Sequence, residues 1–290
     1  MKLFGLPGFV GAATLGALVL AGAPAVSAQS AASLKANGLA NLESGNLQGA
    51  VDEFTAAISL TPGDATLFAN RAAAKTGQSN YGGAVEDYTQ VIKLKPKEAN
   101  GYLLRALASL FQGNVAGAAQ DCDKALELDP KDPTLYLYRG IIADCDNNQQ
   151  GAVDAFGKAI DLGAKSAPLT ANYAQLYRAF DLRRQGPDAP LQLEDSEKWQ
   201  SAWTKTIAGY LSGKVNDAGL LSRAGASAAD EKSQKREKAE AYYFTGRMHV
   251  INGDNPGAKA AFQASFDLQY PADVQRRLAQ VELDRLNATH

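Results

Sequence analysis

The chain has 290 residues, and its 29 Lys and Arg residues nearly balance its 31 Asp and Glu residues. This length allows one or two ordinary domains, and the balanced charge argues against nucleic-acid binding and against a disordered acidic tail. Histidine occurs only at positions 249 and 290, and no GxSxG, Walker, HExxH, CxxC or paired-carboxylate pattern is present. We therefore expect a protein that is not an enzyme and that binds no metal, no cofactor and no nucleic acid.

Residues 1–28 have the features of a secretory signal peptide. Lys2 supplies a positive start, residues 9–20 form an apolar stretch, and the sequence Val-Ser-Ala that ends at Ala28 provides the small residues that signal peptidase needs. The alternative is an uncleaved membrane anchor, which would need roughly 20 apolar residues, more than this stretch has. We expect cleavage near Ala28, so that the mature chain begins near Gln29, lies in a bacterial periplasm or is secreted, and has no stable membrane anchor.

From residue 31 onward the sequence repeats with a period of 34 residues. The frames follow one another without an insertion and cover residues 31–64, 65–98, 99–132 and 133–166. Each frame contains two apolar-periodic segments separated by a polar break, which reads SGN, QSN, QGN or DNN. This pattern predicts four consecutive helical hairpins.

Residues of particular sizes recur at fixed places in these frames. Small residues in both helices allow their backbones to approach closely: Gly38, Ala72, Ala106 and Gly140 in the first helix, and Ala50, Ala84, Ala118 and Ala152 in the second. A larger residue fills the seam of each hairpin: Phe54, Tyr88, Cys122 and Phe156. Prolines end the second helix of the first three frames: Pro62, Pro96 and Pro130.

The period, the small residues, the aromatic position and the terminal proline together resemble the tetratricopeptide repeat. The resemblance implies an all-α solenoid in which stacked helical hairpins supply one another with a core, closed by a C-terminal capping helix. Three positions depart from the family pattern. Asn41 and Lys75 stand where the family often has tyrosine, and Ala164 replaces the fourth proline. We therefore expect the helix or its exit turn to differ after the fourth repeat.

The sequence after the fourth repeat is less regular. Residues 167–185 predict one further helix, and 186–195 form a proline-containing connector. From Ser196 we expect a helix that carries Trp199 and Trp203 on one face, together with Ile207 and Tyr210. These two tryptophans are either aromatic anchors for a partner or part of the core, which is the more common place for such residues.

A further repeat is expected at 239–272, where Gly246, Ala258 and Phe262 fall in register with the earlier frames, and residues 271–286 predict a closing helix. The chain then divides into four parts. They are a signal peptide at 1–28, an N-terminal array with its extra helix at 29–185, a connector with irregular helices at 186–238, and a C-terminal repeat with a capping helix at 239–290.

A narrower resemblance appears in this second half. Trp203 with Gly213, GLLSRA at 219–224, YYFTGRMHVINGD at 242–254 and VELDRL at 281–286 are similar to bacterial envelope tetratricopeptide repeat proteins of the NlpI-like type. That resemblance implies an adaptor that holds periplasmic proteases and cell-wall hydrolases together. The lipidated cysteine of the NlpI lipoprotein is absent from this leader, so its outer-membrane anchoring is not implied here.

In the resembled family the first helices line a concave groove, with repeat positions 5 and 9 pointing inward. These positions give the candidate partner-binding residues: Lys35, Leu39, Ala69, Ala73, Leu103, Leu107, Leu137 and Ile141. Leu39 stands where a carboxylate-binding repeat would have asparagine, so a clamp for a peptide C-terminus is not expected. Two alternatives remain open: an apolar groove that accepts a protein or peptide, or a groove filled by the chain's own 167–211 helices or by a second copy in a homo-dimer.

Two smaller features also have two interpretations. Arg71, Arg105 and Arg139 recur with Glu53, Asp87 and Asp121, either as a ladder of ion pairs between helices or as a basic stripe for an acidic partner. Cys122 and Cys145 would be exposed to an oxidising compartment after export and form either a disulfide or two free thiols packed in separate seams.

Overall fold

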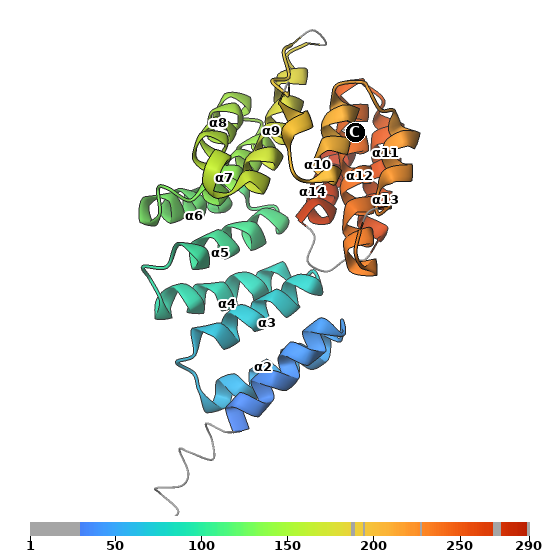
Figure 1. Cartoon of the computed structure of the whole chain (residues 1–290). Helices are drawn as coiled ribbons and strands as arrows, with labels where there is room; N and C mark the ends of the chain where they lie inside the picture. The colour runs from blue at the N-terminus through green and yellow to red at the C-terminus, as the bar shows by residue number, and fades with distance from the viewer. Residues whose placement is uncertain (1–29, 187–188, 194, 227, 269–273, 289–290) are drawn as a thin grey trace, which may run out of the picture.

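The computed structural model describes residues 30–186, 189–193, 195–226, 228–268 and 274–288. Within these ranges the regular structure is entirely helical, and successive helices pack as antiparallel pairs into an α-solenoid (Figure 1). The predicted all-α solenoid is therefore confirmed. The predicted signal peptide lies outside the described residues.

Four helix pairs occupy residues 30–166, in the segments that the repeat pattern predicted to be helical. The pairs are a first helix at 30–43 with α2 (Leu47–Leu60), α3 (Ala65–Gly77) with α4 (Tyr81–Leu94), α5 (Ala99–Phe111) with α6 (Val115–Leu128), and α7 (Pro133–Cys145) with α8 (Gln149–Ser166). Helix α8 has 18 residues, whereas α2 has 14. This extension confirms the different exit expected where Ala164 replaces a proline.

The last residue of each polar break starts the second helix of its hairpin. Asn46, Asn80, Asn114 and Asn148 each accept a hydrogen bond through Oδ1 from the backbone N–H of a glycine three residues later, at 3.0–3.1 Å. The asparagine thereby satisfies a backbone donor that the first turn of a helix leaves free. A β-carbon on the glycine would overlap the capping side chain, as at Gly83 and Asn80. The Asn-x-x-Gly pattern is thus the local signal that places each hairpin turn.

Three hairpin seams are closed by a phenylalanine lying against a glycine. A β-carbon on Gly38 would lie 2.6 Å from Cε1 of Phe54, and one on Gly246 would lie 2.6 Å from Cε1 of Phe262. Gly140 meets Phe156 in the same way, and all three phenylalanines are fully buried. The small residue is therefore required by direct contact between one helix backbone and one ring.

This contact predicts the effect of a single added methyl group. We expect Gly140→Ala to lower the free energy of unfolding by about 1–3 kcal/mol, because the ring of Phe156 cannot move within a close-packed seam. Gly157 lies in the same hairpin with no atom near its missing β-carbon, so Gly157→Ala is expected to gain ~0.5–1 kcal/mol from helix propensity. Urea unfolding followed by circular dichroism measures both. Equal stability of the two variants would contradict the packing argument.

A ladder of ion pairs ties the first and second helices of the middle repeats. Arg71 donates to Asp87 through Nε and Nη2 at 2.9 and 2.6 Å, and Arg105 makes the same two-point contact with Asp121 at 2.7 and 2.7 Å. Each pair joins residues of one hairpin. Arg139 departs from this pattern because it pairs instead with Asp123 of the preceding repeat, at 2.6 Å.

The C-terminal half continues the helical pairing with less regular lengths. It consists of α9 (Pro168–Arg183), a short 3-10 turn (Ser196–Lys198), α10 (Ala202–Leu211), α11 (Asp217–Arg223), α12 (Glu231–Ile251), α13 (Asn255–Asp267) and α14 (Val274–Ala288). The prediction of one helix from Ser196 is wrong. Ser201 caps α10 by accepting a hydrogen bond from the N–H of Thr204 at 3.3 Å, and Trp199 precedes that cap in extended backbone.

The C-terminal helices fold back along the N-terminal array, so that the last helix lies beside repeats far earlier in the chain (Figure 1). Arg277 on α14 donates to the hydroxyl of Tyr81 at 2.9 Å, and its guanidinium lies 5.7 Å from the centre of the Phe111 ring. Arg285 donates to the side chain of Asn147 at 2.5 Å. These contacts join the last helix to the N-terminal array, so that the chain forms a hook. The C-terminal helices lie against part of the array.

Candidate functional site

The groove positions predicted for the first two repeats are exposed or half-buried. Leu39 is 39% exposed, and Ala73 is also exposed. Ala69 is half-buried, and the amine of Lys35 donates to the Thr66 hydroxyl at 2.5 Å. The groove residues predicted from the first two frames are therefore accessible along one surface.

The same positions are covered in the third and fourth repeats. Leu103 packs with Leu135 of the next repeat and is buried, and Leu107 is half-buried beside it. Leu137 and Ile141 are buried in the main core, in the same cluster as side chains of α9 and α10. The neighbouring repeat therefore covers these positions in the third repeat, whereas the chain's own second half covers them in the fourth.

Both tryptophans lie in the core. Trp199 is 8% exposed and Trp203 is 5% exposed, and each packs in the main cluster. Trp203 also donates through Nε1 to Oε2 of Glu240 at 2.6 Å. Trp203 therefore holds the carboxylate of Glu240 on α12 in place, and both residues line a cavity.

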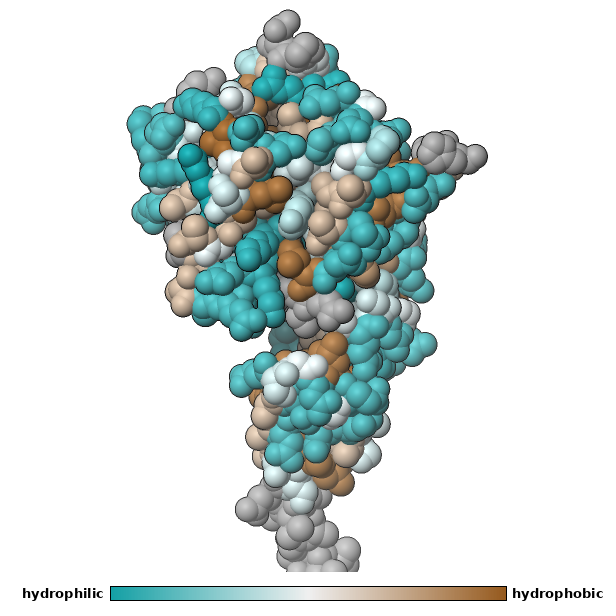
Figure 2. All heavy atoms as spheres, turned by 90° about the vertical axis from the view of Figure 1, so that its right-hand side faces the viewer, coloured by the Kyte–Doolittle hydropathy of each residue, from teal (hydrophilic) through white to brown (hydrophobic). Residues whose placement is uncertain are grey.

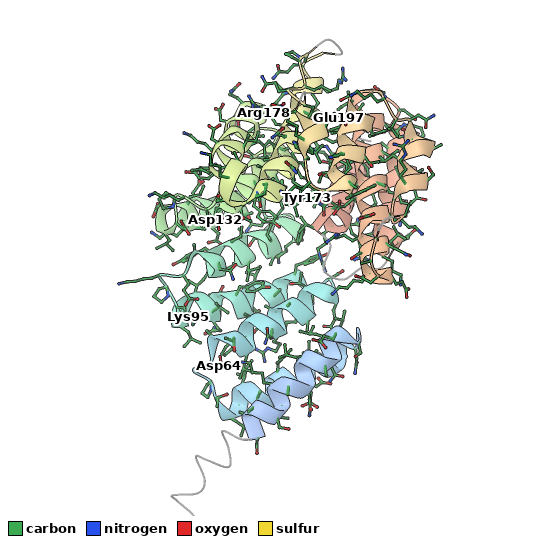
Figure 3. The ribbon with its side chains drawn as sticks, in the orientation of Figure 1. Asp64, Lys95, Asp132, Tyr173, Arg178 and Glu197 are labelled. Atoms are coloured by element: carbon green, nitrogen blue, oxygen red, sulfur yellow. The ribbon has the colours of Figure 1, made fainter. Side chains whose placement is uncertain are left out.

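That cavity, about 320 Å³ in volume, lies where the two halves of the hook meet. Its walls come from α7, α9, α10, α12 and the start of α14. Apolar, aromatic and acidic side chains line it, among them Leu137, Ile141, Tyr173, Tyr177, Trp203 and Glu240. Figure 3 places Tyr173 between the N-terminal array and the C-terminal helices. We call this space the junction pocket.

Three of the wall residues, Leu137, Ile141 and Trp203, are among the site residues predicted from the sequence. Tyr173 and Tyr177 were missed because they lie outside the 34-residue frames, and Glu240 was missed although it lies in the repeat expected at 239–272. The spacing of the two tyrosines, four residues apart on the predicted 167–185 helix, is the only local signal that places them on one helix face.

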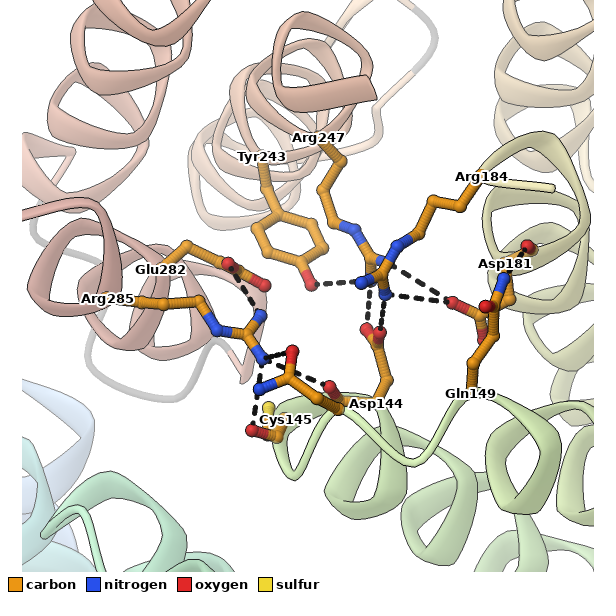
Figure 4. Close-up of polar contacts among 10 residues, drawn as sticks. Asp144, Cys145, Gln149, Asp181, Arg184, Tyr243, Arg247, Glu282 and Arg285 are labelled. Carbon is orange, nitrogen blue, oxygen red and sulfur yellow. Dashed lines mark hydrogen bonds and ion pairs between the residues drawn. The ribbon is translucent and has the colours of Figure 1, made fainter. Parts of the chain in front are cut away.

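A second junction of the two halves is held by buried charges (Figure 4). Arg247 on α12 donates to Asp144 Oδ2 at 2.7 Å and lies 3.6 Å from Asp181 Oδ1. Arg184 reaches Asp144 at 2.8 Å and Asp181 at 3.8 Å. Burial and the nearby Asp144 raise the pKa of Asp181 to about 7, against the opposing effect of the two arginines. We call these four residues the charge cluster.

The two cysteines and His249 pack or form contacts within the fold. Both thiols are free; Cys122 is buried in the α5–α6 hairpin, where burial raises its pKa to about 12, and Cys145 ends α7. His249 lies 3.1 Å from Asp217 and 2.8 Å from Asp254, linking α11 to α12 and α13. In the described part of the chain, no group of three or more His, Cys, Asp and Glu side chains is arranged to hold a metal ion.

The face of the molecule on the side of the C-terminal helices is mainly hydrophilic, with hydrophobic residues in separate small patches (Figure 2). A broad continuous apolar patch would mark an interface, and this face does not show one. Among the residues that the structure describes, no helix combines the length and the apolar character needed to cross a bilayer.

The repeat geometry agrees with a comparison against known families. The family model described as tetratricopeptide repeat matches residues 71–133, which span α3 to α6 and both two-point ion pairs. The chain contains tetratricopeptide repeats. Proteins built from this repeat are generally scaffolds that bind other proteins on extended concave surfaces.

Solved structures share the tetratricopeptide fold at low sequence identity. A tetratricopeptide repeat protein from Parabacteroides merdae is 18% identical, with a TM-score of 0.52, over 87% of this chain and 98% of that chain. The MamA protein is 15% identical, with a TM-score of 0.50, over 60% of this chain and 98% of its own. The Cut9–Hcn1 hetero-tetramer is 17% identical, with a TM-score of 0.50, over 93% of this chain and 44% of that chain. No curated protein matches the sequence. At these identities the likeness concerns the fold alone.

Proposed function

We propose that this protein is an exported scaffold that binds a segment of another polypeptide along the inner face of its first two repeats. The observation that carries the proposal is the difference between equivalent positions. Leu39 is 39% exposed, whereas Ile141, at the same position of the fourth repeat, is 3% exposed because it packs in the core that this repeat forms with the C-terminal half. The N-terminal groove is thus the part of the concave surface left for a partner.

The sequence supports an envelope setting for this scaffold. Residues 1–28 have the pattern of a cleaved leader, and the second half is similar to NlpI-like adaptors. The proposed role is therefore to bring envelope proteins together, such as proteases or cell-wall hydrolases, from a periplasmic chain without a lipid anchor. N-terminal sequencing of protein recovered from the native source is expected to begin near Gln29.

Site-specific photocrosslinking in cells tests the groove. A photoreactive residue at Ala73, which is exposed on α3, is expected to capture a partner polypeptide, whereas one at Gln120, which is exposed on α6 in the other helix layer, is not. The double variant Leu39→Asp, Ala73→Asp is expected to remove the product with little change in stability, since substitutions at exposed sites change stability by only about 0.5 kcal/mol.

Two results would overturn the proposal. Capture of the same polypeptides at Ala73 and Gln120 would show that the groove has no special role. A product with the mass of two copies of this chain, together with a dimer in light scattering, would favour the alternative of a structural homo-oligomer that fills its own groove.

A further inference from the structure

We propose that the junction pocket binds one cationic side chain, a lysine or an arginine, of the polypeptide that lies in the groove. This inference rests on the proposed function for the source of the cation, and it adds the chemistry by which the partner is recognised. Leu137 and Ile141, the groove positions of the fourth repeat, also form the wall of the junction pocket. The pocket therefore lies at the fourth-repeat end of the row of predicted groove positions, whose exposed members belong to repeats one and two.

The size and the walls of the pocket fit an aliphatic stem that ends in a charge. A volume of about 320 Å³ is at the lower limit of ordinary ligand sites. Leucine and isoleucine form one side of it, and the rings of Tyr173 and Trp203 form another. Aromatic faces attract ammonium and guanidinium groups, most strongly where water is excluded.

The charge of the pocket selects a cation over an anion. Glu237 is 7% exposed and Glu240 is 2% exposed, and both line the cavity. Arg236 is the one cation among the wall residues of the described chain, and its side chain is 48% exposed and lies 3.8 Å from Glu240. Two buried carboxylates against one half-exposed guanidinium leave a net negative pocket.

The carboxylate of Glu240 is also held in place before any ligand arrives. Trp203 donates to its Oε2 at 2.6 Å, and the hydroxyl of Tyr173 donates to the same atom at 2.8 Å. Glu237 is fixed in turn, because its Oε2 accepts the backbone N–H of Gly225 at 2.9 Å. Groups fixed in this way bind a ligand with little loss of side-chain entropy.

An independent observation points to a missing polar partner. Tyr177 lines the pocket, its hydroxyl is buried, and that oxygen has no hydrogen-bond partner in the described structure. Buried polar groups are nearly always paired in folded proteins. An ammonium or guanidinium group has only donors, so it would supply the bond that the Tyr177 oxygen can accept.

Tryptophan fluorescence of the full chain provides the test, because the sequence has two tryptophans and Trp203 lies in the pocket wall. The probes are the blocked tripeptides Ala-Lys-Ala and Ala-norleucine-Ala, which differ only in the terminal amine, and free pentylamine. We expect the lysine peptide to bind at least about tenfold more tightly than the norleucine peptide. Pentylamine is expected to bind more weakly than the lysine peptide, since it lacks a backbone to lie in the groove.

Two variants assign the preference to the pocket. Glu240→Gln keeps a carbonyl oxygen for Trp203 and Tyr173 but removes the charge, and Tyr177→Phe removes only the unpaired hydroxyl. Each is expected to reduce the preference for lysine while leaving norleucine binding unchanged. Tyr177→Phe keeps the test valid if Glu240→Gln fails to fold, because it removes no existing hydrogen bond.

Three outcomes would overturn the inference. Equal affinity for the lysine and norleucine peptides would remove the cation specificity, and a lysine preference that persists in both variants would place it elsewhere. Pentylamine binding as tightly as the lysine peptide would make the ligand a free amine and not a polypeptide. The groove proposal is judged separately by crosslinking at Ala73, so its failure can be distinguished from a failure of the pocket to prefer a cation.

Discussion

Replacing Arg247 with methionine is expected to lower the free energy of unfolding by about 3–5 kcal/mol at pH 7. The Arg247 side chain is 6% exposed and contacts Asp144 at 2.7 Å and Asp181 at 3.6 Å. Methionine has a similar length and no charge, so two buried carboxylates would share Arg184 as their remaining cation. Because Arg247 belongs to α12 and the carboxylates to α7 and α9, the loss falls on the contact between the two halves of the hook.

Urea unfolding followed by circular dichroism measures this loss, and Lys235→Met is the matched control. Lys235 lies on the same helix, its side chain is 49% exposed, and it pairs with Glu231 one turn away. Removing an exposed pair of this kind is expected to cost less than ~1 kcal/mol. A similar small loss for both variants would mean that the charge cluster does not hold the halves together.

Replacing Asp181 with asparagine is expected to stabilise the protein at alkaline pH. The carboxylate is fully buried, and neither of its oxygens accepts a hydrogen bond. Burial, and then Asp144, raise the pKa of Asp181 to about 7, whereas an unfolded chain has an aspartate pKa of about 3.9. Between about pH 4 and pH 7 the folded state therefore holds a proton on Asp181 that the unfolded state has already released.

The sign follows from this difference. The contribution of Asp181 to stability is fully present below about pH 4 and is lost as the pH rises through about 7. Asparagine resembles the protonated acid and has no such loss, so we expect Asp181→Asn to gain about 1–3 kcal/mol at pH 8 and progressively less toward pH 4. Denaturation at several pH values measures this. Asp154→Asn, an exposed change on α8, is the control, and a pH profile unchanged in Asp181→Asn would refute the argument.

The local patterns of the sequence predicted the array well. The 34-residue period placed the helix pairs of the first four repeats, and the recurring small residues marked the tight seams. The absence of a proline at Ala164 indicated a different exit from the fourth repeat, which the structure shows as a longer α8. The period also indicated that these arginines and acidic residues recur together, but the structure decided that Arg71 pairs with Asp87. Each of these features depends on residues within one repeat, so their spacing along the chain is enough to predict them.

The sequence was less informative where a local pattern had two readings. The spacing of Trp199 and Trp203 fits one helix face, yet Ser201 interrupts the helix between them by capping α10. A capping serine competes with helix continuation through its own side-chain bond, and a four-residue spacing does not reveal which of the two prevails. The division of the whole chain into domains likewise stays a prediction.

By itself the sequence determined that this chain stacks helical hairpins, because the apolar period, the Asn-x-x-Gly caps and the glycine–phenylalanine contacts act within about one repeat. Only the tertiary structure decided which of the predicted groove positions stay exposed and where the junction pocket lies. Those features depend on contacts such as Tyr173 with Glu240, 67 residues apart, and Arg277 with Tyr81, 196 residues apart. No period links residues at such separations, since what brings them together is the path by which the C-terminal helices fold back.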